Sequence, residues 1–418
     1  MSIPGNETIR KTMEARLPAF LHDLETLVGI DSNTGNMEGS RGIAAFLKPR
    51  IAAAGGVYEE RISPEPGGVH VIARFKGQGE KVCLIVVHTD TVLNTKGGAF
   101  PYRYDAAGGL AYGPGVGDCK ASALMALHLA EAFHHLGHKP FKELILYFDA
   151  EEEQFSSPVE HDIAVELARE SDYVLLADTG RPNCGVVTKR KTNGSYTFTV
   201  TGHDGHAGNA PHASANALLE ACRLAVKVAA LGSPLPEDPW NYTSEALAER
   251  GVRDTGQFIP DNALNVAVVS SGNDKLNVVP ADAVLKVNLR CYEQAEHERI
   301  VAVMRELAEH PSTPWTTVAF TGAQTAKPME LTPEARAMID LYAAIAEREC
   351  GETVEEWTAG GVTLANVTAQ IAPTMDSVGV DTDPMVEHSE REVIEPALFV
   401  PRAIIAYHFI REFDARRA

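Results

Sequence analysis

Imidazole and carboxylate side chains follow three apolar runs of the sequence at the points where those runs end. The runs cover residues 83–87, 144–148 and 173–176. The ionisable residues that come after them are His88 and Asp90, then Glu151, Glu152 and Glu153, and finally Asp178. In an open α/β sheet, the carboxyl ends of parallel strands face one crevice, so these groups are expected to converge there. Because imidazoles and carboxylates bind divalent transition metals, the pattern predicts a metal site.

The segment His88-Thr89-Asp90 places a carboxylate two residues after an imidazole. This spacing allows the acid to fix the orientation of the ring while the ring binds a metal. A histidine at a strand end is also commonly a hydrogen-bonded structural residue. The motif alone therefore leaves both interpretations open.

Asp118 ends the glycine-rich run 113–118, which reads Gly-Pro-Gly-Val-Gly-Asp. The glycines permit an unusual backbone path that pushes the carboxylate forward, and an N-cap of the amphipathic helix expected over 121–136 is the alternative. A dinucleotide site is disfavoured because its fingerprint is Gly-x-Gly-x-x-Gly and because Asp118 would repel a pyrophosphate. The sequence has neither a Walker lysine loop nor a Gly-x-Ser-x-Gly elbow, which removes the usual signatures of phosphoryl transfer and of serine hydrolases.

Three adjacent carboxylates, residues 151–153, follow the second apolar run. Such groups repel one another unless cations neutralise them, although a solvated acidic loop would also tolerate them. Together with the histidines and Asp118, they supply what a pair of zinc ions roughly 3.5–4 Å apart requires, with an activated water between the ions.

Charge and cysteine usage narrow the function classes. The 418 residues carry a formal net charge of -20 and show no cluster of Lys and Arg, which argues against a nucleic-acid surface. Six cysteines are scattered without a Cys-x-x-Cys pair, a pattern typical of a reducing compartment. Residues 1–7 contain no apolar signal region, and no stretch reaches the roughly 18 apolar residues of a membrane span. We therefore expect a soluble, cytoplasmic protein without nucleic-acid or membrane partners.

The order of the predicted elements divides the chain into two domains. Helix and strand patterns alternate over residues 8–188 and resume over 333–413, which predicts an α/β domain with a mostly parallel sheet and helices on both faces. In between, the order is strand, helix, strand, strand, helix, strand, which is typical of a ferredoxin-like α+β unit. We expect a catalytic domain over 1–189 and 324–418, and an inserted domain over 190–323.

Strand patterns within the inserted domain alternate polar and apolar residues, as in 196–200. One face of its sheet is therefore expected to be solvated or covered by a partner. The proline-rich stretch 232–262 is expected to form a surface excursion, and the sequence indicates no role for it.

Five motifs in order resemble those of the two-zinc metallopeptidases that include glutamate carboxypeptidase, aminoacylase, acetylornithine deacetylase and tripeptidase. The motifs are residues 88–92, residues 111–120, Glu152-Glu153, Asp178 and residues 387–389. The similarity spans nearly the whole chain, and its second motif looks most like the bacterial glutamate carboxypeptidase branch. The resemblance implies a zinc-peptidase-like catalytic domain with an inserted dimerisation domain that acts as a lid.

The resemblance also implies two Zn2+ ions per subunit, which Co2+ or Mn2+ could replace. The implied ligands are, for one zinc, His88, Asp118 and Asp178, and, for the other, Asp118, Glu153 and His388. Glu152 would be the general base that takes a proton from the bridging water and passes it to the leaving amine, and Asp90 would orient His88. The family motif continues with glycine where Gln154 stands here, so a pair of Glu151 and Glu152 is the alternative register.

The resemblance implies further roles in the inserted domain. His206 matches a histidine that reaches across a dimer to stabilise the oxyanion, which implies a homodimer with shared sites. Asn277 and Arg290 match positions that recognise the terminal carboxylate of the substrate in the carboxypeptidase branch, a task that suits an arginine. Structural alternatives stay open, with His206 as a loop cap and Arg290 as the partner of an acid in its own sheet.

Two glycine motifs differ from the family pattern. Ala121 and Ser122 stand where glycines usually follow, and the loop of Gly360 and Gly361, expected to contact the substrate, lacks its usual acid. These differences bear on substrate choice more than on metal binding. The expected function is hydrolysis of an amide bond next to a free carboxylate, which releases an amino acid from a short peptide or an N-acyl or folate-like conjugate. The alternatives are an N-acyl amino acid deacylase, a di- or tripeptidase and, outside this class, a catalytically silent dimeric binding protein.

Overall fold

The computed structural model describes residues 4–93, 100–154, 157–233, 261–272, 274–382 and 386–416. The chain forms two compact units. The first comprises Met1–Thr188, Leu331–Thr358 and Thr363–Ala418, and the second comprises Lys189–Glu330 and Ala359–Val362. The second unit therefore interrupts the first. Its later boundary follows Glu330, whereas the sequence placed it at 323.

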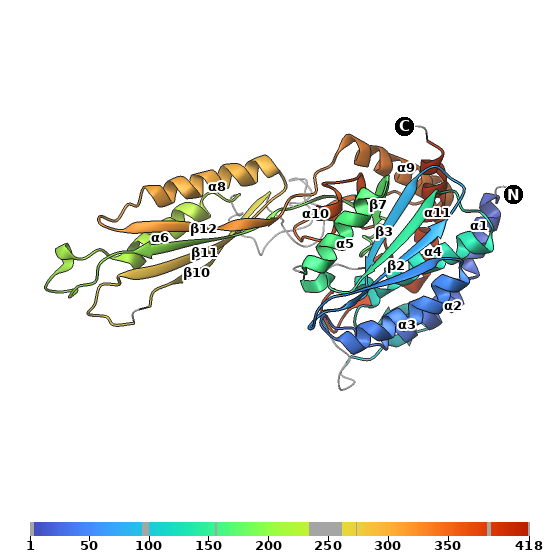
Figure 1. Cartoon of the computed structure of the whole chain (residues 1–418), viewed down its shortest axis with the longest axis horizontal. Helices are drawn as coiled ribbons and strands as arrows, with labels where there is room; N and C mark the ends of the chain where they lie inside the picture. The colour runs from blue at the N-terminus through green and yellow to red at the C-terminus, as the bar shows by residue number, and fades with distance from the viewer. Residues whose placement is uncertain are drawn as a thin grey trace. The chain divides into compact units, whose positions relative to one another are not determined.

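A sheet of eight strands forms the centre of the first unit (Figure 1). In spatial order the strands are β1 (Val57–Ile62), β2 (Val69–Lys76), β6 (Glu143–Asp149), β3 (Val82–His88), β7 (Tyr173–Leu176), β14 (Thr374–Asp376), β8 (Val186–Arg190) and β13 (Glu356–Ala359). The central strands β6, β3, β7 and β14 run parallel. The pairs β1–β2, β2–β6 and β14–β8 are antiparallel. The predicted α/β fold with a mostly parallel sheet is confirmed, and antiparallel strands extend it toward its edges.

Helices flank this sheet, whose central strands are mostly apolar. Every residue of β3 and of β6 is buried, as in parallel strands that are covered on both faces. Helix α3 (Met37–Ala53) packs on β1 and β2, α4 (Ala121–His135) on β3 and β6, and α9 (Pro333–Cys350) on β14. The other helices of this unit are α1 (Asn6–Glu14), α2 (Leu17–Val28), α5 (Pro158–Arg169), α10 (Ala365–Thr368) and α11 (Phe399–Asp414).

A small sheet and a turn carry Asp118 to the start of α4. The small sheet contains β15 (Val393–Ile394), β5 (Leu110–Tyr112) and β4 (Arg103–Asp105), and the turn Val116–Lys120 follows. Gly115 has a φ of +70°, and a side chain there would collide with the methyl group of Thr91. Only glycine satisfies both requirements, so the glycine-rich run is what allows this path.

The second unit is a four-stranded antiparallel sheet with two helices. Its strands, in the spatial order β10-β11-β9-β12, are β10 (Asn262–Ser270), β11 (Asp282–Cys291), β9 (Asn193–Thr201) and β12 (Thr317–Ala326), and its helices are α6 (Ala217–Ala229) and α8 (Gln294–Glu309). Buried and exposed residues alternate along β9 and β11, because the helices pack against the sheet from one side. The strand β12 continues past 323, which moves the boundary of the unit. Of the predicted excursion 232–262, residues 234–260 lie outside the described residues.

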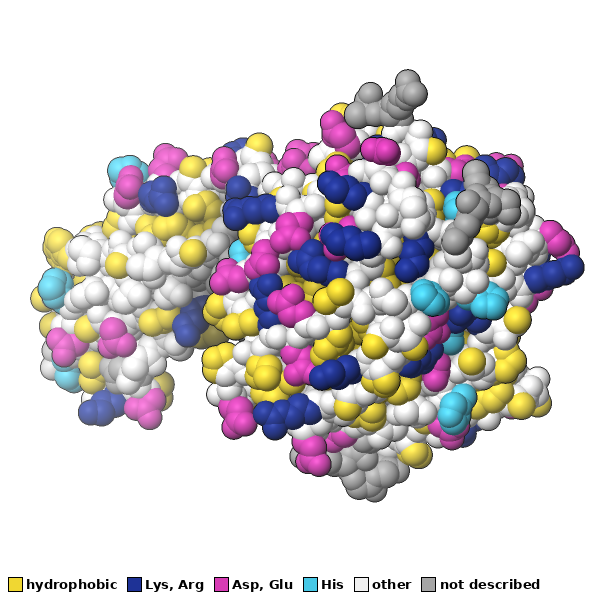
Figure 2. Space-filling model, turned by 45° about the vertical axis from the view of Figure 1, so that its right-hand side comes forward, with side chains coloured by type: hydrophobic (Ala, Val, Ile, Leu, Met, Phe, Trp, Pro, Cys, Tyr) yellow, Lys and Arg dark blue, Asp and Glu magenta, His cyan; other side chains and the backbone are white. Residues whose placement is uncertain are grey.

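Three further properties concern the chain as a whole. None of the described helices combines the length and the apolar character that crossing a membrane would need. All six cysteines are free thiols. Figure 2 shows acidic and basic side chains interspersed over the face in view.

Candidate metal centre

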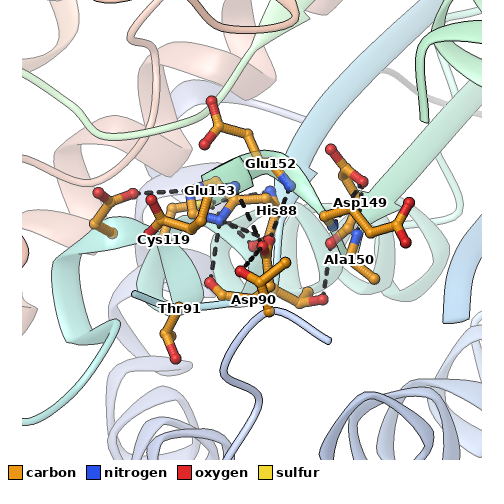
Figure 3. A network of polar contacts seen from close by, with 12 residues as sticks. His88, Asp90, Thr91, Cys119, Asp149, Ala150, Glu152 and Glu153 are labelled. Atoms are coloured by element: carbon orange, nitrogen blue, oxygen red, sulfur yellow. Dashed lines mark hydrogen bonds and ion pairs between the residues drawn. The ribbon is translucent and has the colours of Figure 1, made fainter. Parts of the chain in front are cut away.

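The strands that precede the predicted site residues lie side by side. β3 pairs in parallel with β6, where His88 is opposite Asp149, and with β7 on its other side. A short helical turn, Glu152–Gln154, follows β6, and Asp178 follows β7. The ionisable groups at these strand ends therefore meet at one edge of the sheet (Figure 3).

Asp118 lies between two histidines that are distant in the sequence. Its Oδ1 atom is 2.7 Å from Nε2 of His88, and its Oδ2 atom is 3.0 Å from Nε2 of His388. Asp178 Oδ1 lies 3.3 Å from His88 Nε2, and Glu153 Oε2 lies 3.1 Å from His388 Nε2. The five predicted ligand residues thus form two histidine–carboxylate groups that share Asp118.

The two groups differ in their access to solvent. His88, Asp118 and Asp178 are buried, whereas the side chain of His388 is 50% exposed. A cavity of about 10 Å³ is lined by His88, Glu152 and Asp178, which is about the space that one water molecule needs. A water molecule could therefore reach these three side chains.

Asp90 connects His88 to the acidic turn. Its Oδ1 atom lies 3.4 Å from Nδ1 of His88, and its two carboxylate oxygens accept the backbone N–H groups of Glu152 and Glu153, each at 3.2 Å. The hydroxyl of Thr34 donates to the same carboxylate at 2.7 Å. One carboxylate thus holds both the ring and the turn, as a supporting residue of a metal site does.

The three consecutive glutamates point in different directions. Glu153 contacts His388 and Glu152 lines the small cavity. Glu151 is buried away from both, where its carboxylate accepts the hydroxyl of Ser63 at 2.8 Å and the N–H of Gly68 at 3.2 Å. Of the two registers, the pair of Glu152 and Glu153 is the one that faces the histidines.

Negative charge is concentrated at this edge of the sheet. Burial raises the pKa of Glu152 well above its usual value, and the charges of Asp178 and Glu153 add to this effect. Burial also raises the pKa of Glu153, although His388 opposes the shift. Hydrogen bonds with Asp118 and Glu153 raise the pKa of His388 to about 11. Such shifts arise where carboxylates crowd together without enough positive charge.

The predicted residues of the second unit form two pairs. His206 is exposed, and its Nδ1 accepts the N–H groups of Gly208 and Asn209 at 3.1 Å, which is the geometry of a loop cap. The carbonyl of Asn277 accepts the N–H of Ala207 at 3.0 Å, so Asn277 lies beside His206.

The other pair joins Arg290 to the predicted glycine loop. Arg290 donates to the side chain of Asn288 and to the carbonyl of Gly360, both at 3.1 Å. Among the described residues it has no carboxylate partner, and burial lowers its pKa. Gly361 lies close to Arg190, so the loop sits between two guanidinium groups.

Sequence comparison identifies the second unit. Residues 188–316 match the family model of the M20 peptidase dimerisation domain. The chain is an M20 peptidase homologue. It is 25% identical to carboxypeptidase G2 of a Pseudomonas species over 367 residues, which cover 87% of this chain and 82% of that protein. It is 26% identical to the succinyl-diaminopimelate desuccinylase of Beijerinckia indica over 362 residues, which cover 80% and 85% of the two chains.

Solved structures of M20 peptidases share the fold. The aminopeptidase PepT of Bacillus cereus superposes with a TM-score of 0.71 at 16% identity, and 96% of this chain and 99% of that chain are covered. The M20 family metallo-carboxypeptidase of Sulfolobus solfataricus superposes with a TM-score of 0.66 at 15% identity, with 95% and 99% covered. At this identity the superpositions show a shared fold, and together with the sequence matches they support a peptidase or amidohydrolase enzyme.

The Sulfolobus solfataricus relative is a metallo-carboxypeptidase, and the donor set observed in this chain fits divalent metal ions. Ligand atoms of His88, Asp118 and Glu153 lie within 4.8 Å of one another, and those of His88, Cys119 and Asp178 do likewise. In the part of the chain that the structure describes, the buried oxygen Glu153 Oε1 has no hydrogen-bond partner, and Asp178 Oδ1 has the contact of 3.3 Å with His88 Nε2 alone. Because an unpaired buried carboxylate oxygen is costly, bound cations would remove that cost.

Sequence reasoning missed two supporting residues of this candidate site. Thr34, described above, comes from the loop between α2 and α3. Glu392 accepts the N–H groups of Gly115 at 3.1 Å, Gly117 at 2.9 Å and Asp118 at 3.0 Å, and so holds the turn that presents Asp118. No apolar run or spacing marks either residue, so only the tertiary structure finds them.

Proposed function

We propose that this M20 enzyme is a two-zinc hydrolase that cleaves an amide bond next to a free carboxylate. The reaction would release an amino acid from a short peptide or from an N-acyl or folate-like conjugate. The observation that carries the proposal is the sharing of Asp118 between two histidine–carboxylate groups. A carboxylate with a histidine at each of its oxygens is the arrangement that a bridged pair of ions requires.

In this proposal each ion has three protein ligands. His88, Asp118 and Asp178 hold one ion, and Asp118, Glu153 and His388 hold the other. Zinc suits this mixture of nitrogen and oxygen donors, and Co2+ or Mn2+ could take its place. When bound, the ions would lower the pKa of water at the site and polarise the carbonyl oxygen of the scissile amide.

Glu152 is the proposed general base. It takes a proton from the attacking water and passes that proton to the nitrogen of the leaving amine. Burial and neighbouring carboxylates raise its pKa, which suits a group that must accept a proton and then release it. Asp90, which accepts the backbone N–H groups of Glu152 and Glu153, would keep the base in place and orient His88.

The second unit would supply substrate contacts and the dimer interface. We assign oxyanion stabilisation to His206 in a homodimer, and recognition of the substrate carboxylate to Asn277 and Arg290 with the loop of Gly360 and Gly361. Support comes from the match to a dimerisation domain and from Arg290, which lacks a carboxylate partner among the described residues. An unpaired guanidinium is well suited to bind a carboxylate through two hydrogen bonds. The free cysteines are consistent with a cytoplasmic enzyme.

A substrate panel tests the reaction class. Purified enzyme with added zinc would be assayed on dipeptides, tripeptides, γ-glutamyl and folate-like conjugates, and N-acyl amino acids. We expect cleavage of peptide or folate-like conjugates that end in a free carboxylate. Cleavage of N-acyl amino acids alone would instead favour a deacylase, to which the similarity with the desuccinylases points. A protein that binds these compounds without cleaving any of them would be the catalytically silent alternative.

A further inference from the structure

A buried histidine lies between two carboxylates at the base of the acidic turn. His70, on β2, is fully buried. Its Nδ1 atom is 3.0 Å from Asp149 Oδ1, and its Nε2 atom is 3.2 Å from Glu151 Oε2. Asp149 ends β6 and Glu151 precedes Glu152, so the ring contacts the chain on both sides of Ala150.

The surroundings of His70 favour its charged form. Both ring nitrogens face carboxylate oxygens, and only an imidazolium can donate from both nitrogens. The hydroxyls of Tyr147 and Ser63, each 3.1 Å from a ring nitrogen, complete the shell. Burial alone would lower the pKa of His70, but the hydrogen bonds with Asp149 and Glu151 outweigh it and raise the pKa to about 9.

The two carboxylates that His70 holds in turn fix the backbone before Glu152. Asp149 Oδ1 accepts the N–H of Ala150 at 2.6 Å and the N–H of Glu151 at 3.1 Å (Figure 3). Glu151 is tied by its side chain to Ser63 and to the N–H of Gly68. His70 is therefore the only cation among these contacts, and it neutralises the charge on which they depend.

A third acid, Glu160, adds to the carboxyl groups that are buried near His70. Glu160, on α5, is buried, and burial together with the charge of Asp149 raises its pKa to about 12. Oxygens Asp149 Oδ2 and Glu160 Oε1 are both buried without a hydrogen-bond partner among the described residues, and a proton on Glu160 would satisfy both. The remaining negative charges of Asp149 and Glu151 then have His70 as their counterion.

We propose that His70 is a positioning residue of the active site, which holds the turn of Glu152 and Glu153 in place through Asp149 and Glu151. Among the described residues, His70 forms no hydrogen bond or ion pair with Glu152 or Glu153. The ring acts through the neighbouring carboxylates of Asp149 and Glu151. Asp90 holds the same turn from the side of His88. The turn is thus fixed from both sides, by Asp90 on its N–H groups and by His70 at its base. This inference rests on the proposed function for the roles of Glu152 and Glu153.

The chain offers a matched control for a substitution at His70. His128, on α4, is also buried, and its Nε2 atom lies 2.8 Å from Asp23 Oδ2. Its carboxylate partners, Asp23 and Glu131, are also bound by Arg50, and among the described residues neither forms a hydrogen bond or ion pair with the acidic turn. His70→Gln and His128→Gln therefore remove equivalent buried rings, one beside the turn and one away from it.

Two readouts test the proposal. In zinc-loaded enzyme, we expect His70→Gln to lower kcat by about 10- to 100-fold with KM nearly unchanged, the range found for supporting residues of metal sites. In metal-free protein, we expect amide hydrogen exchange of the peptide spanning 149–154 to quicken about tenfold or more, as its local stability falls. His128→Gln should lower the melting temperature and change neither kcat nor that exchange rate.

Equal kcat in the two variants, or exchange of the 149–154 peptide that His70→Gln leaves unchanged, would overturn the proposal. If His70→Gln does not fold, Glu151→Gln serves instead, because it keeps the shape of the side chain and removes the charge that pairs with the ring. It should quicken the same exchange, and unchanged exchange would count against the proposal. If the wild-type enzyme cleaves nothing in the substrate panel but His70→Gln still loosens the turn, the proposed function fails and the positioning of the turn by His70 stands.

Discussion

Two clusters of histidine and carboxylate side chains in the first unit differ in their balance of charge: one is half-buried beside α4, and the other is the candidate metal centre. Beside α4, the carboxylates of Asp23 and Glu131 are paired with basic side chains at 2.5–2.8 Å. The partners are the guanidinium groups of Arg16 and Arg50 and the ring of His128. At the candidate metal centre, Glu153 keeps a buried oxygen without a hydrogen-bond partner among the described residues. The carboxylates of the first cluster are paired with arginines of the protein, whereas the second cluster has an excess of carboxylates that the proposed metal ions would neutralise.

The pKa shifts follow this difference. Burial would raise the pKa of Asp23 and of Glu131, but hydrogen bonds from His128 and Arg50 outweigh burial and lower both. At the metal centre burial prevails, and the pKa values of Glu152 and Glu153 rise. An excess of buried carboxylates therefore distinguishes a functional cluster from a structural one.

The largest effect is expected for Glu152→Gln. The amide keeps the size of the side chain but cannot accept a proton, so kcat should fall by about 10²- to 10⁴-fold. Because Glu152 is not a proposed ligand, the bound metal should remain. Steady-state kinetics combined with elemental analysis measures both, and full turnover in the metal-loaded variant would remove Glu152 from its role as the base.

The second-largest effect is expected from removal of metal, which should affect the candidate metal centre and not the cluster beside α4. Bound ions stabilise the folded state by mass action, by about 4 kcal/mol at a thousandfold excess over the dissociation constant. We expect EDTA to lower the melting temperature of the wild-type protein and zinc to restore it. Asp118→Asn should abolish this response, because both groups share that carboxylate. A response to zinc in Asp118→Asn equal to that of the wild type would contradict the shared site.

The contribution of His70 to stability should depend on pH. Its pKa is about 9 in the folded protein against about 6.5 for a free histidine. Its contribution, roughly 3 kcal/mol, is complete below pH 6.5 and is lost as the pH rises through 9. The groups that face the ring are Asp149, Glu151, Ser63 and Tyr147, and burial raises the pKa of Tyr147 well above this range.

Urea unfolding of metal-free protein between pH 6 and 10 measures this contribution. The wild-type protein and His128→Gln should both lose stability across that range, whereas His70→Gln should lose much less. The same slope in all three proteins would assign the loss to other groups.

The smallest effect concerns the cluster beside α4. Arg50 pairs with both Asp23 and Glu131, and Arg50→Gln should reduce the free energy of unfolding by about 1–3 kcal/mol. Metal content and kcat should not change. Denaturant unfolding and the zinc assay check both points, and a loss of metal binding in Arg50→Gln would mean that the clusters are coupled.

The site residues that follow strands of the sheet could be predicted, because the ends of those strands can be recognised in the sequence. His88, Glu152, Glu153 and Asp178 follow apolar runs that stop abruptly, and parallel strands bring such ends together. Asp118 is marked by the glycines of its turn. His388 follows no apolar run, so the family resemblance alone indicated it, and it is the ligand candidate with the most exposed side chain.

The supporting residues could not be predicted from sequence patterns. His70 lies within the apolar strand β2 and reads as one more buried residue, and Thr34 and Glu392 reach the site from loops. Their contacts depend on how β2, β3 and β6 align and on where the loops pack. The sequence also places the end of the second unit at 323, before the end of β12. This strand continues to Ala326 with small and polar residues, which are weak indicators of a strand.

The most direct test of the account is a metal titration of the metal-free enzyme, followed by elemental mass spectrometry and by activity on the cleaved substrate. We predict two zinc ions per chain in fully active wild-type protein, and loss of bound zinc together with loss of activity in Asp118→Asn. Full activity in wild-type protein that contains no divalent transition metal would contradict the account.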